Sequence, residues 1–145
     1  MKFDFLKKDP DNRFFPVSKE EIGDVEKELN LKIPSELVQF YNEIGYGFIK
    51  SSSNNINRLM DPLSLRDFRL RENDFELYPD IEAYEELEDG KLVFFEANES
   101  TLMLISFSNE DCGAIYYDEY KIADSLTEFL EKLTKNDCYY MDIVD

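Results

Sequence analysis

Hydrophobic residues recur at helical spacing near the start of the chain. Ile22, Val25 and Leu29 lie at intervals of three and four positions, which places them on one face of a helix. The preceding Ser18-Lys19-Glu20-Glu21 has the serine-to-glutamate spacing of a helix N-terminus. Pro34 pushes the residue before it out of helical geometry. The pattern therefore predicts a helix that begins after Ser18 and is broken before Pro34.

A second helix is predicted to follow directly. Pro34 suits the first turn of a helix, where its missing N–H costs nothing, and Gly45 provides the stop. The apolar stripe between them consists of Leu37, Phe40, Tyr41 and Ile44. The polar run 51–57 predicts a loop. Asp61-Pro62 then predicts the start of a short helix that carries Leu63, Leu65 and Phe68.

The periodicity changes to that of strands after residue 90. Three short runs are rich in residues that favour strands, and their connectors have hairpin lengths. The runs are 92–96, 102–107 and 114–117, joined by 97–100 and 108–113. The middle run is almost wholly apolar, so we expect it at the centre of the sheet with both faces covered. The pattern Ser125-Leu126-Thr127-Glu128 predicts a closing helix with an apolar face of Leu126, Phe129, Leu130 and Leu133.

These elements predict one α+β domain over residues 1–145, because helices and a largely antiparallel sheet occupy separate stretches of the chain. We expect a sheet of about five strands, with two N-terminal helices and a C-terminal helix packed on it. Residues 1–17 read as an irregular lead-in whose aromatic rings dock on the core. Residues 135–145 contain a tail that is apolar enough to form an edge strand or to meet a partner.

Composition removes several classes of chemistry. The 145 residues include no histidine, which excludes histidine-based triads, histidine-ligated zinc and a histidine general base. Cys112 and Cys138 form no Cys-x-x-Cys pair and read as two free thiols in a reducing compartment. No apolar run approaches the roughly 20 residues of a membrane helix, and the start of the chain lacks the apolar stretch of a signal peptide. We therefore expect a cytoplasmic protein.

The net charge of −17 is confined to the second half of the chain. Residues 1–71 hold 12 basic and 12 acidic side chains, whereas residues 72–145 hold 4 basic and 21 acidic ones. Nucleic acids and anionic membranes need a positive surface, so neither is an expected partner. A field of one sign instead attracts basic partners and accelerates their association.

Other candidate sites carry weak signals. Asn109-Glu110-Asp111-Cys112-Gly113 places acids near a glycine but lacks the spacing of a calcium loop, and we expect no metal. Among 33 acidic residues some pair will always fit the distance that glycoside hydrolysis needs, so that signal says little. Gly45-Tyr46-Gly47 lacks the third glycine and the lysine of a phosphate-binding motif. We expect no cofactor and no enzymatic activity; a small hydrolase stays open only as a third reading.

The segment 72–90 stands apart from the rest. It holds nine acidic and no basic residues, interleaved with Phe75, Leu77, Tyr78, Ile81, Tyr84 and Leu87. Acids with spaced apolar residues favour an ordered segment on the surface over a flexible acidic tail. A solvated face is the plain alternative. Crowded like charges repel one another and so cost stability. We therefore favour the hypothesis that these acidic residues have a function, which is docking a basic protein surface.

Several motifs together resemble the SUKH superfamily. The run from Ile22 to Gly47 has an acidic first helix, then Ile33-Pro34, an aromatic second helix and a Gly-x-Gly-like stop. Arg58-Leu59-Met60-Asp61-Pro62 is similar to the family's strand before a small helix, and 122–130 to its closing helix. The resemblance spans roughly residues 18–134. This chain departs from the family pattern at Phe48, since members often carry a third glycine and a tryptophan near that stop.

The resemblance implies an α+β domain without catalytic residues. Bacterial members are mostly immunity proteins that bind and neutralise toxins, often nucleases, and fungal relatives regulate cell-wall assembly through protein contacts. Pro34, Gly45 and Gly47 match family positions that look structural. The leading hypothesis is thus a non-enzymatic, cytoplasmic immunity protein, a monomer or weak homodimer, that binds a basic toxin domain. The alternative is a regulatory adaptor for an endogenous protein.

The predicted contact surface lies within the segment 72–90. Apolar anchors would supply affinity, and the acids around them would set orientation and association rate. The anchors are Phe75, Tyr78 and Tyr84, and the surrounding acids are Asp74, Glu76, Asp80, Glu82, Glu85, Glu86, Glu88 and Asp89.

Overall fold

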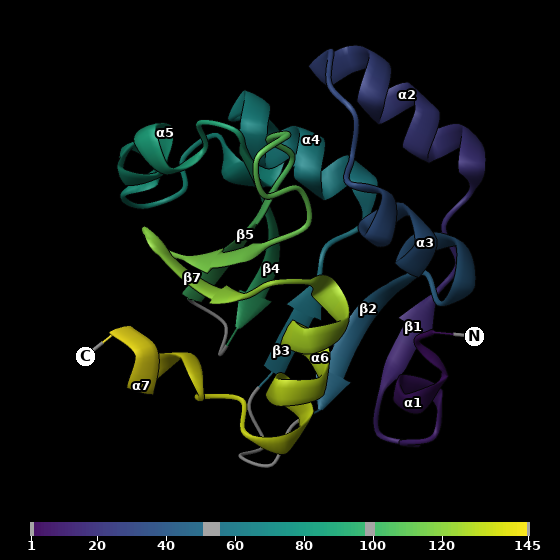
Figure 1. Ribbon diagram of the computed structural model, residues 1–145. Coiled ribbons are helices and arrows are strands. Elements are labelled where there is room, and N and C mark those ends of the chain that lie inside the picture. Colours follow the sequence, from purple (N-terminus) through teal and green to yellow (C-terminus); the bar gives the residue numbers. More distant parts are fainter. Residues whose placement is uncertain (1, 51–55, 98–100, 145) are drawn as a thin grey trace.

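The computed structural model describes residues 2–50, 56–97 and 101–144. Within them, seven strands form one sheet in which each strand pairs antiparallel with the next one along the chain (Figure 1). The strands are β1 (Arg13–Phe15), β2 (Tyr46–Lys50), β3 (Ile56–Leu59), β4 (Lys91–Ala97), β5 (Thr101–Ser106), β6 (Ile115–Tyr117) and β7 (Tyr120–Ala123). The predicted α+β class is confirmed, with seven strands instead of about five.

Helices flank the sheet and join its strands. The longer ones are α2 (Lys19–Leu29), α3 (Ser35–Glu43), α4 (Pro62–Leu70) and α6 (Leu126–Lys135). The short ones are α1 (Asp4–Lys7), η1 (Asn73–Phe75), η2 (Ile81–Ala83), α5 (Tyr84–Leu87) and α7 (Tyr140–Val144). In Figure 1, α6 lies in front of the sheet, while α2, α3 and α4 gather above it and to its right. Helix α4 packs against α2 and β4, and α6 and α7 both contact β7.

The two predicted N-terminal helices are confirmed, and local chemistry explains their ends. The Ser18 hydroxyl accepts a hydrogen bond from the Glu21 N–H at the start of α2. Pro34 precedes the first residue of α3. After α3 the backbone of Gly45 has a φ of +109°, and a Cβ there would stand 1.9 Å from the Phe15 carbonyl oxygen. Only glycine lets β1 approach that turn so closely.

The sequence patterns missed parts of the sheet. Strands β1 and β7 are only three and four residues long, too short for alternation to reveal them. The predicted loop 51–57 is wrong at its end, because Ile56 and Asn57 belong to β3 and pair with β2. The rest of that loop, 51–55, lies outside the described residues, as do residues 98–100 of a predicted connector.

The centre of the core lies where the sheet meets α6. As predicted, β5 lies in the interior of the sheet, paired with β4 and β6, and five of its six residues are buried. A bulge in β4 between Val93 and Phe95 interrupts the regular pairing with β5. The rings of both Phe94 and Phe95 therefore reach Phe129 of α6, at 6.1 Å and 5.0 Å between centroids. Without that bulge, two consecutive residues would point to opposite faces.

Both ends of the chain contribute to the same core. Phe3 and Leu6 are buried, as the predicted docking of the lead-in requires. The C-terminal tail is not an edge strand: it forms α7, whose Tyr140 is buried and meets the ring of Tyr117 at 4.9 Å. Residues 136–139 connect α6 to Tyr140, and this short connector redirects the chain onto β7.

Candidate binding surface

The acidic segment 72–90 is ordered and lies against α4. It consists of η1, η2 and α5 joined by turns. The fully buried ring of Phe68 in α4 contacts three aromatic rings of the segment edge-on. These are Phe75 at 5.1 Å, Tyr84 at 5.6 Å and Tyr78 at 6.0 Å between centroids. Aromatic packing on one residue thus holds the segment on the domain.

A buried ion pair fastens the end of the segment. Glu88 is only 7% exposed, and its carboxylate lies 2.6 Å from Arg71 Nη2 and 3.9 Å from Arg69 Nη1. Arg69 also donates hydrogen bonds to the carbonyls of Glu88 and Lys91. Burial raises the pKa of Glu88, and the charges of Arg71 and Arg69 oppose that rise. Of the predicted contact acids, Glu88 is therefore the one whose charge is neutralised inside the protein.

The other eight acids of the segment are exposed to solvent. None forms an ion pair with a residue that the structure describes, in contrast to acids elsewhere such as Glu28 and Asp67, which both pair with Arg66. The eight are Glu72, Asp74, Glu76, Asp80, Glu82, Glu85, Glu86 and Asp89. Their charge faces the solvent uncompensated, which is the arrangement that attracts a basic surface.

The structure places the predicted apolar anchors differently from one another. Phe75 is 8% exposed and packs on Phe68, so its ring serves the fold. Tyr78 and Tyr84 are half-buried, and each presents one side to solvent. Leu77, which we did not predict as an anchor, is 90% exposed and directly follows the exposed Glu76. An exposed leucine beside carboxylates has the character of a contact residue, and only the structure separates it from Phe75.

An open groove of about 640 Å³ borders the segment. One wall comes from the turn before η2, with Tyr78 and Asp80, and from α5, with Tyr84. The other comes from Leu102 of β5, from Tyr117 at the end of β6 and from Asp118 in the turn that follows. Sequence reasoning missed the second wall, because Tyr117 reads as an ordinary sheet residue. The acidic turn Asp118-Glu119 next to a tyrosine pair was the available signal, and its distance along the chain from residue 84 concealed it.

The remaining sequence candidates have structural roles. Asp111 accepts hydrogen bonds from the hydroxyls of Ser106 and Tyr116 and so closes the 107–114 turn. The hydrogen bond from the Tyr116 hydroxyl to Asp111, followed by burial, raises the pKa of Tyr116 to about 12. Among the described residues, no three or more His, Cys, Asp or Glu side chains gather as metal ligands would. Neither Cys112 nor Cys138 forms a disulfide within the described part of the chain.

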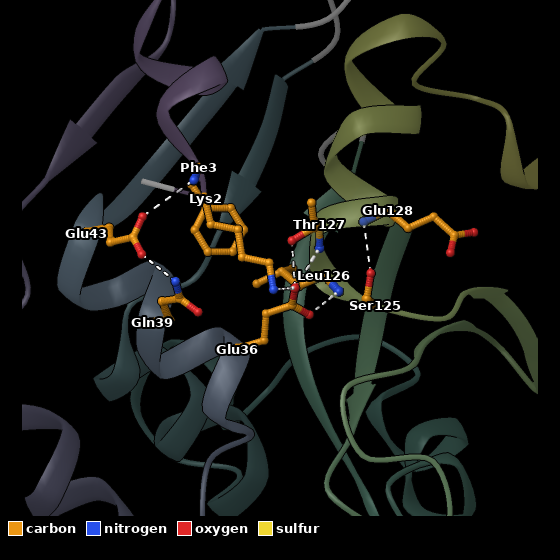
Figure 2. Close-up of polar contacts among 9 residues, drawn as sticks. All are labelled: Lys2, Phe3, Glu36, Gln39, Glu43, Ser125, Leu126, Thr127 and Glu128. Atoms are coloured by element: carbon orange, nitrogen blue, oxygen red, sulfur yellow. Dashed lines mark hydrogen bonds and ion pairs between the residues drawn. The ribbon is translucent and has the colours of Figure 1, made fainter.

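A second polar cluster surrounds Glu36 of α3. Figure 2 shows its carboxylate at the start of α6, where it accepts hydrogen bonds from the N–H groups of Leu126 and Thr127 at 2.6 Å and 3.2 Å. The Thr127 hydroxyl donates to it as well, and Lys2 Nζ lies 2.8 Å away. Two of these donors are backbone N–H groups at a helix N-terminus, which have no acceptor within the helix. The others are a threonine hydroxyl and a lysine ammonium group. The cluster therefore caps a helix and offers no group for catalysis.

Glu36→Gln should lower the free energy of unfolding by about 2 kcal/mol at neutral pH, because the amide N–H₂ would face backbone donors in place of a charged acceptor. Burial alone would raise the pKa of Glu36, but the hydrogen bonds from Lys2, Thr127 and Leu126 outweigh it and hold the pKa below 4.5. A carboxylate with a depressed pKa stabilises above its unfolded pKa and loses that contribution as the pH falls through the folded value. Urea unfolding from pH 7 down to pH 3 should show the difference between wild type and variant shrink at acid pH.

Glu43→Gln is the matched control on the same helix. Figure 2 shows Glu43 accepting a long hydrogen bond of 3.4 Å from the Phe3 N–H and an exposed one of 2.6 Å from Gln39. Its replacement should cost only about 0.5 kcal/mol, since exposed polar contacts contribute little. Equal losses in the two variants, or a Glu36→Gln effect that persists unchanged at pH 3, would contradict the capping role.

Comparison with known proteins gives two findings. Residues 16–132 match the SMI1 / KNR4 family (SUKH-1). The chain is also 57% identical over 145 residues to the protein named "Immunity protein YxxD" from Bacillus subtilis (strain 168), covering all of this chain and 99% of that one. The matched range agrees closely with residues 18–134, over which the sequence motifs resemble that family. None of the described helices has both the length and the apolar character that crossing a membrane requires.

Proposed function

The chain belongs to the SMI1/KNR4 (SUKH-1) family, and we propose that it is an immunity protein that neutralises a cognate toxin by binding to it. The observation that carries this proposal is the 57% identity, over the whole chain, to a protein named as an immunity protein. The family is non-enzymatic, so neutralisation rests on contact between two proteins. We propose the cytoplasm as the place where the two proteins meet.

The contact surface in this proposal is the exposed acidic part of the segment 72–90. Eight carboxylates without described ion partners support it, and so does the exposed Leu77 among them. A nuclease toxin needs a positive cleft to hold phosphates, and an acidic surface can occupy or block such a cleft. The charges would set the association rate, and the apolar side chains at the centre would set the lifetime of the complex.

We also propose that residues 1–145 act as one domain. The core cluster contains Phe3 from the first turn of the chain and Tyr140 from the last helix, together with residues of every long helix. Shared burial of Phe3 and Tyr140 supports a single folded unit. We further propose that this unit binds its partner as a monomer or weak homodimer.

Co-expression tests the proposed function. The toxic domain encoded next to this gene is expressed in a host from an inducible promoter, with and without this chain, and survival and co-purification are scored. We expect full survival and a 1:1 complex only when this chain is present, because binding rather than chemistry removes the toxicity. The matched control is the toxic domain of an unrelated locus, which this chain should not protect against.

Death of the host at full expression of this chain, with no complex recovered, would contradict an immunity role. The alternative of a regulatory adaptor predicts a different pattern. In that case no toxin gene lies beside this one, and the chain co-purifies with an endogenous protein of its own host.

A further inference from the structure

The groove beside the acidic segment combines aromatic walls with an acidic rim. Tyr78, Tyr84 and Tyr117 line it together with the apolar side chains of Leu87 and Leu102. Its acidic residues are Asp80 and Asp118, both exposed. At about 640 Å³ its volume falls within the roughly 300–1,000 Å³ of ligand-sized sites.

The three tyrosines keep their hydroxyls available. Three other tyrosines donate the hydroxyl to an internal acceptor: Tyr41 to the Met60 carbonyl, Tyr116 to Asp111 and Tyr139 to the Ile122 carbonyl. Within the described residues, Tyr78, Tyr84 and Tyr117 have no such hydrogen bond. Burial and the neighbouring Tyr78, Tyr117 and Asp118 raise the pKa of Tyr84, as expected where phenols converge on one space.

Among the residues that the structure describes, no lysine or arginine lines this groove. Lys121 of β7 is paired with Asp124 at 2.9 Å. Aromatic faces and carboxylates at one site are the two groups that attract a guanidinium: the ring faces stack on its plane and the carboxylates accept its N–H donors. An ammonium group is smaller and more strongly hydrated, so it gains less from the ring faces.

We propose that this groove binds an arginine side chain presented by the toxin. The inference deepens the proposed function, because it names the residue type through which a basic partner is recognised. The eight exposed carboxylates would bring the partner close, and the groove would select an arginine at a fixed place on its surface.

The affinity of the groove can be measured without the toxin. Nα-acetyl-arginine methylamide is titrated into the ¹⁵N-labelled full chain and followed by amide chemical shifts. We expect saturable shifts at Tyr84, Leu102, Tyr117 and Asp118, with a dissociation constant of about 1–10 mM, as a few weak contacts allow. The citrulline analogue has the same shape without the charge and should bind at least about fivefold more weakly.

Two double variants locate the effect. Asp80→Asn with Asp118→Asn should weaken arginine binding about tenfold, since both carboxylates of the groove are lost. Both residues have left-handed backbone, with φ of 58° and 56°, which asparagine tolerates as well as aspartate does. Glu110→Gln with Glu131→Gln removes the same charge from exposed residues outside the groove and should leave binding unchanged.

Absence of saturable shifts at 50 mM, equal binding of citrulline, or equal effects of the two double variants would each overturn the groove proposal. Its failure is distinguishable from failure of the proposed function. Protection and a toxin complex that survive the Asp80→Asn/Asp118→Asn change with full affinity would leave immunity standing and remove the groove. Arginine binding without protection from the toxin would support the groove as an arginine site and contradict the immunity function.

Discussion

Reversing three charges, Glu82→Lys, Glu85→Lys and Glu86→Lys, should slow association with the toxin by about 10- to 100-fold at low ionic strength. All three side chains are exposed on η2 and α5, and none has an ion partner among the described residues. Their replacement therefore changes the field outside the protein with little effect on the fold. The dissociation rate should change by no more than a few-fold, because long-range charge acts mainly before contact.

Stopped-flow association at several salt concentrations measures this effect. The screening length falls from about 10 Å at 0.1 M salt to about 3 Å at 1 M, so the wild type and the triple variant should converge at high salt. An association rate of the wild type that ignores salt would contradict electrostatic steering altogether.

The matched control is Glu20→Lys, Asp24→Lys and Glu131→Lys. These residues are exposed on α2 and α6, away from the segment. Each triple variant changes three charges by two, so both carry a net charge of −11 in place of −17. If position matters, the control should slow association only slightly. Equal slowing by both variants would mean that net charge alone steers the partner and that the segment has no special part.

Phe68→Ala should lower the free energy of unfolding by about 3–5 kcal/mol, the usual cost of removing a buried phenylalanine. That loss is large beside a total stability of roughly 5–15 kcal/mol. Phe68 is also the residue on which Phe75, Tyr78 and Tyr84 converge, and the guanidinium of Arg71 lies 5.2 Å from its ring. The acidic segment should therefore open locally, with fast amide exchange over residues 73–87 while the sheet stays protected.

Phe129→Ala provides the comparison for that variant. Phe129 is as deeply buried, but its ring packs on Phe94 and Phe95 of the sheet. It should cost a similar amount of stability without selective exchange in the segment. Phe68→Leu keeps most of the apolar volume if the alanine variant does not fold. The same exchange pattern in the Phe68 and Phe129 variants would show that Phe68 does not hold the segment.

The sequence predicted the elements whose signals are local. The starts of α2 and α6 are visible because Ser18 and Ser125 cap them through residues three positions away. The segment 72–90 was correctly expected to be ordered, since its apolar residues are spaced among the acids. The family resemblance was visible for the same reason, because its motifs are short stretches in a fixed order.

Which side chains of the segment face outward was beyond reach of the pattern. Phe75 and Leu77 are two positions apart and equally apolar, yet the first is buried on Phe68 and the second is exposed. Turns and short helices have no steady period, so spacing assigns no face to their residues. For the same reason Glu88 could not be separated from its exposed neighbours.

Residue order and type thus established the class of the fold, the helix ends, the acidic character of one half and the absence of histidine chemistry. Contacts between distant positions came from folding in three dimensions. Glu36 caps a helix 90 positions further on, and a bulge turns two consecutive phenylalanines toward one helix. Tyr117 closes a groove whose other wall comes before β4 and β5 in the chain. Local hydrogen bonds and side-chain periodicity can be read from neighbouring positions in the sequence. Contacts between distant residues depend instead on how the seven described strands pair into one sheet.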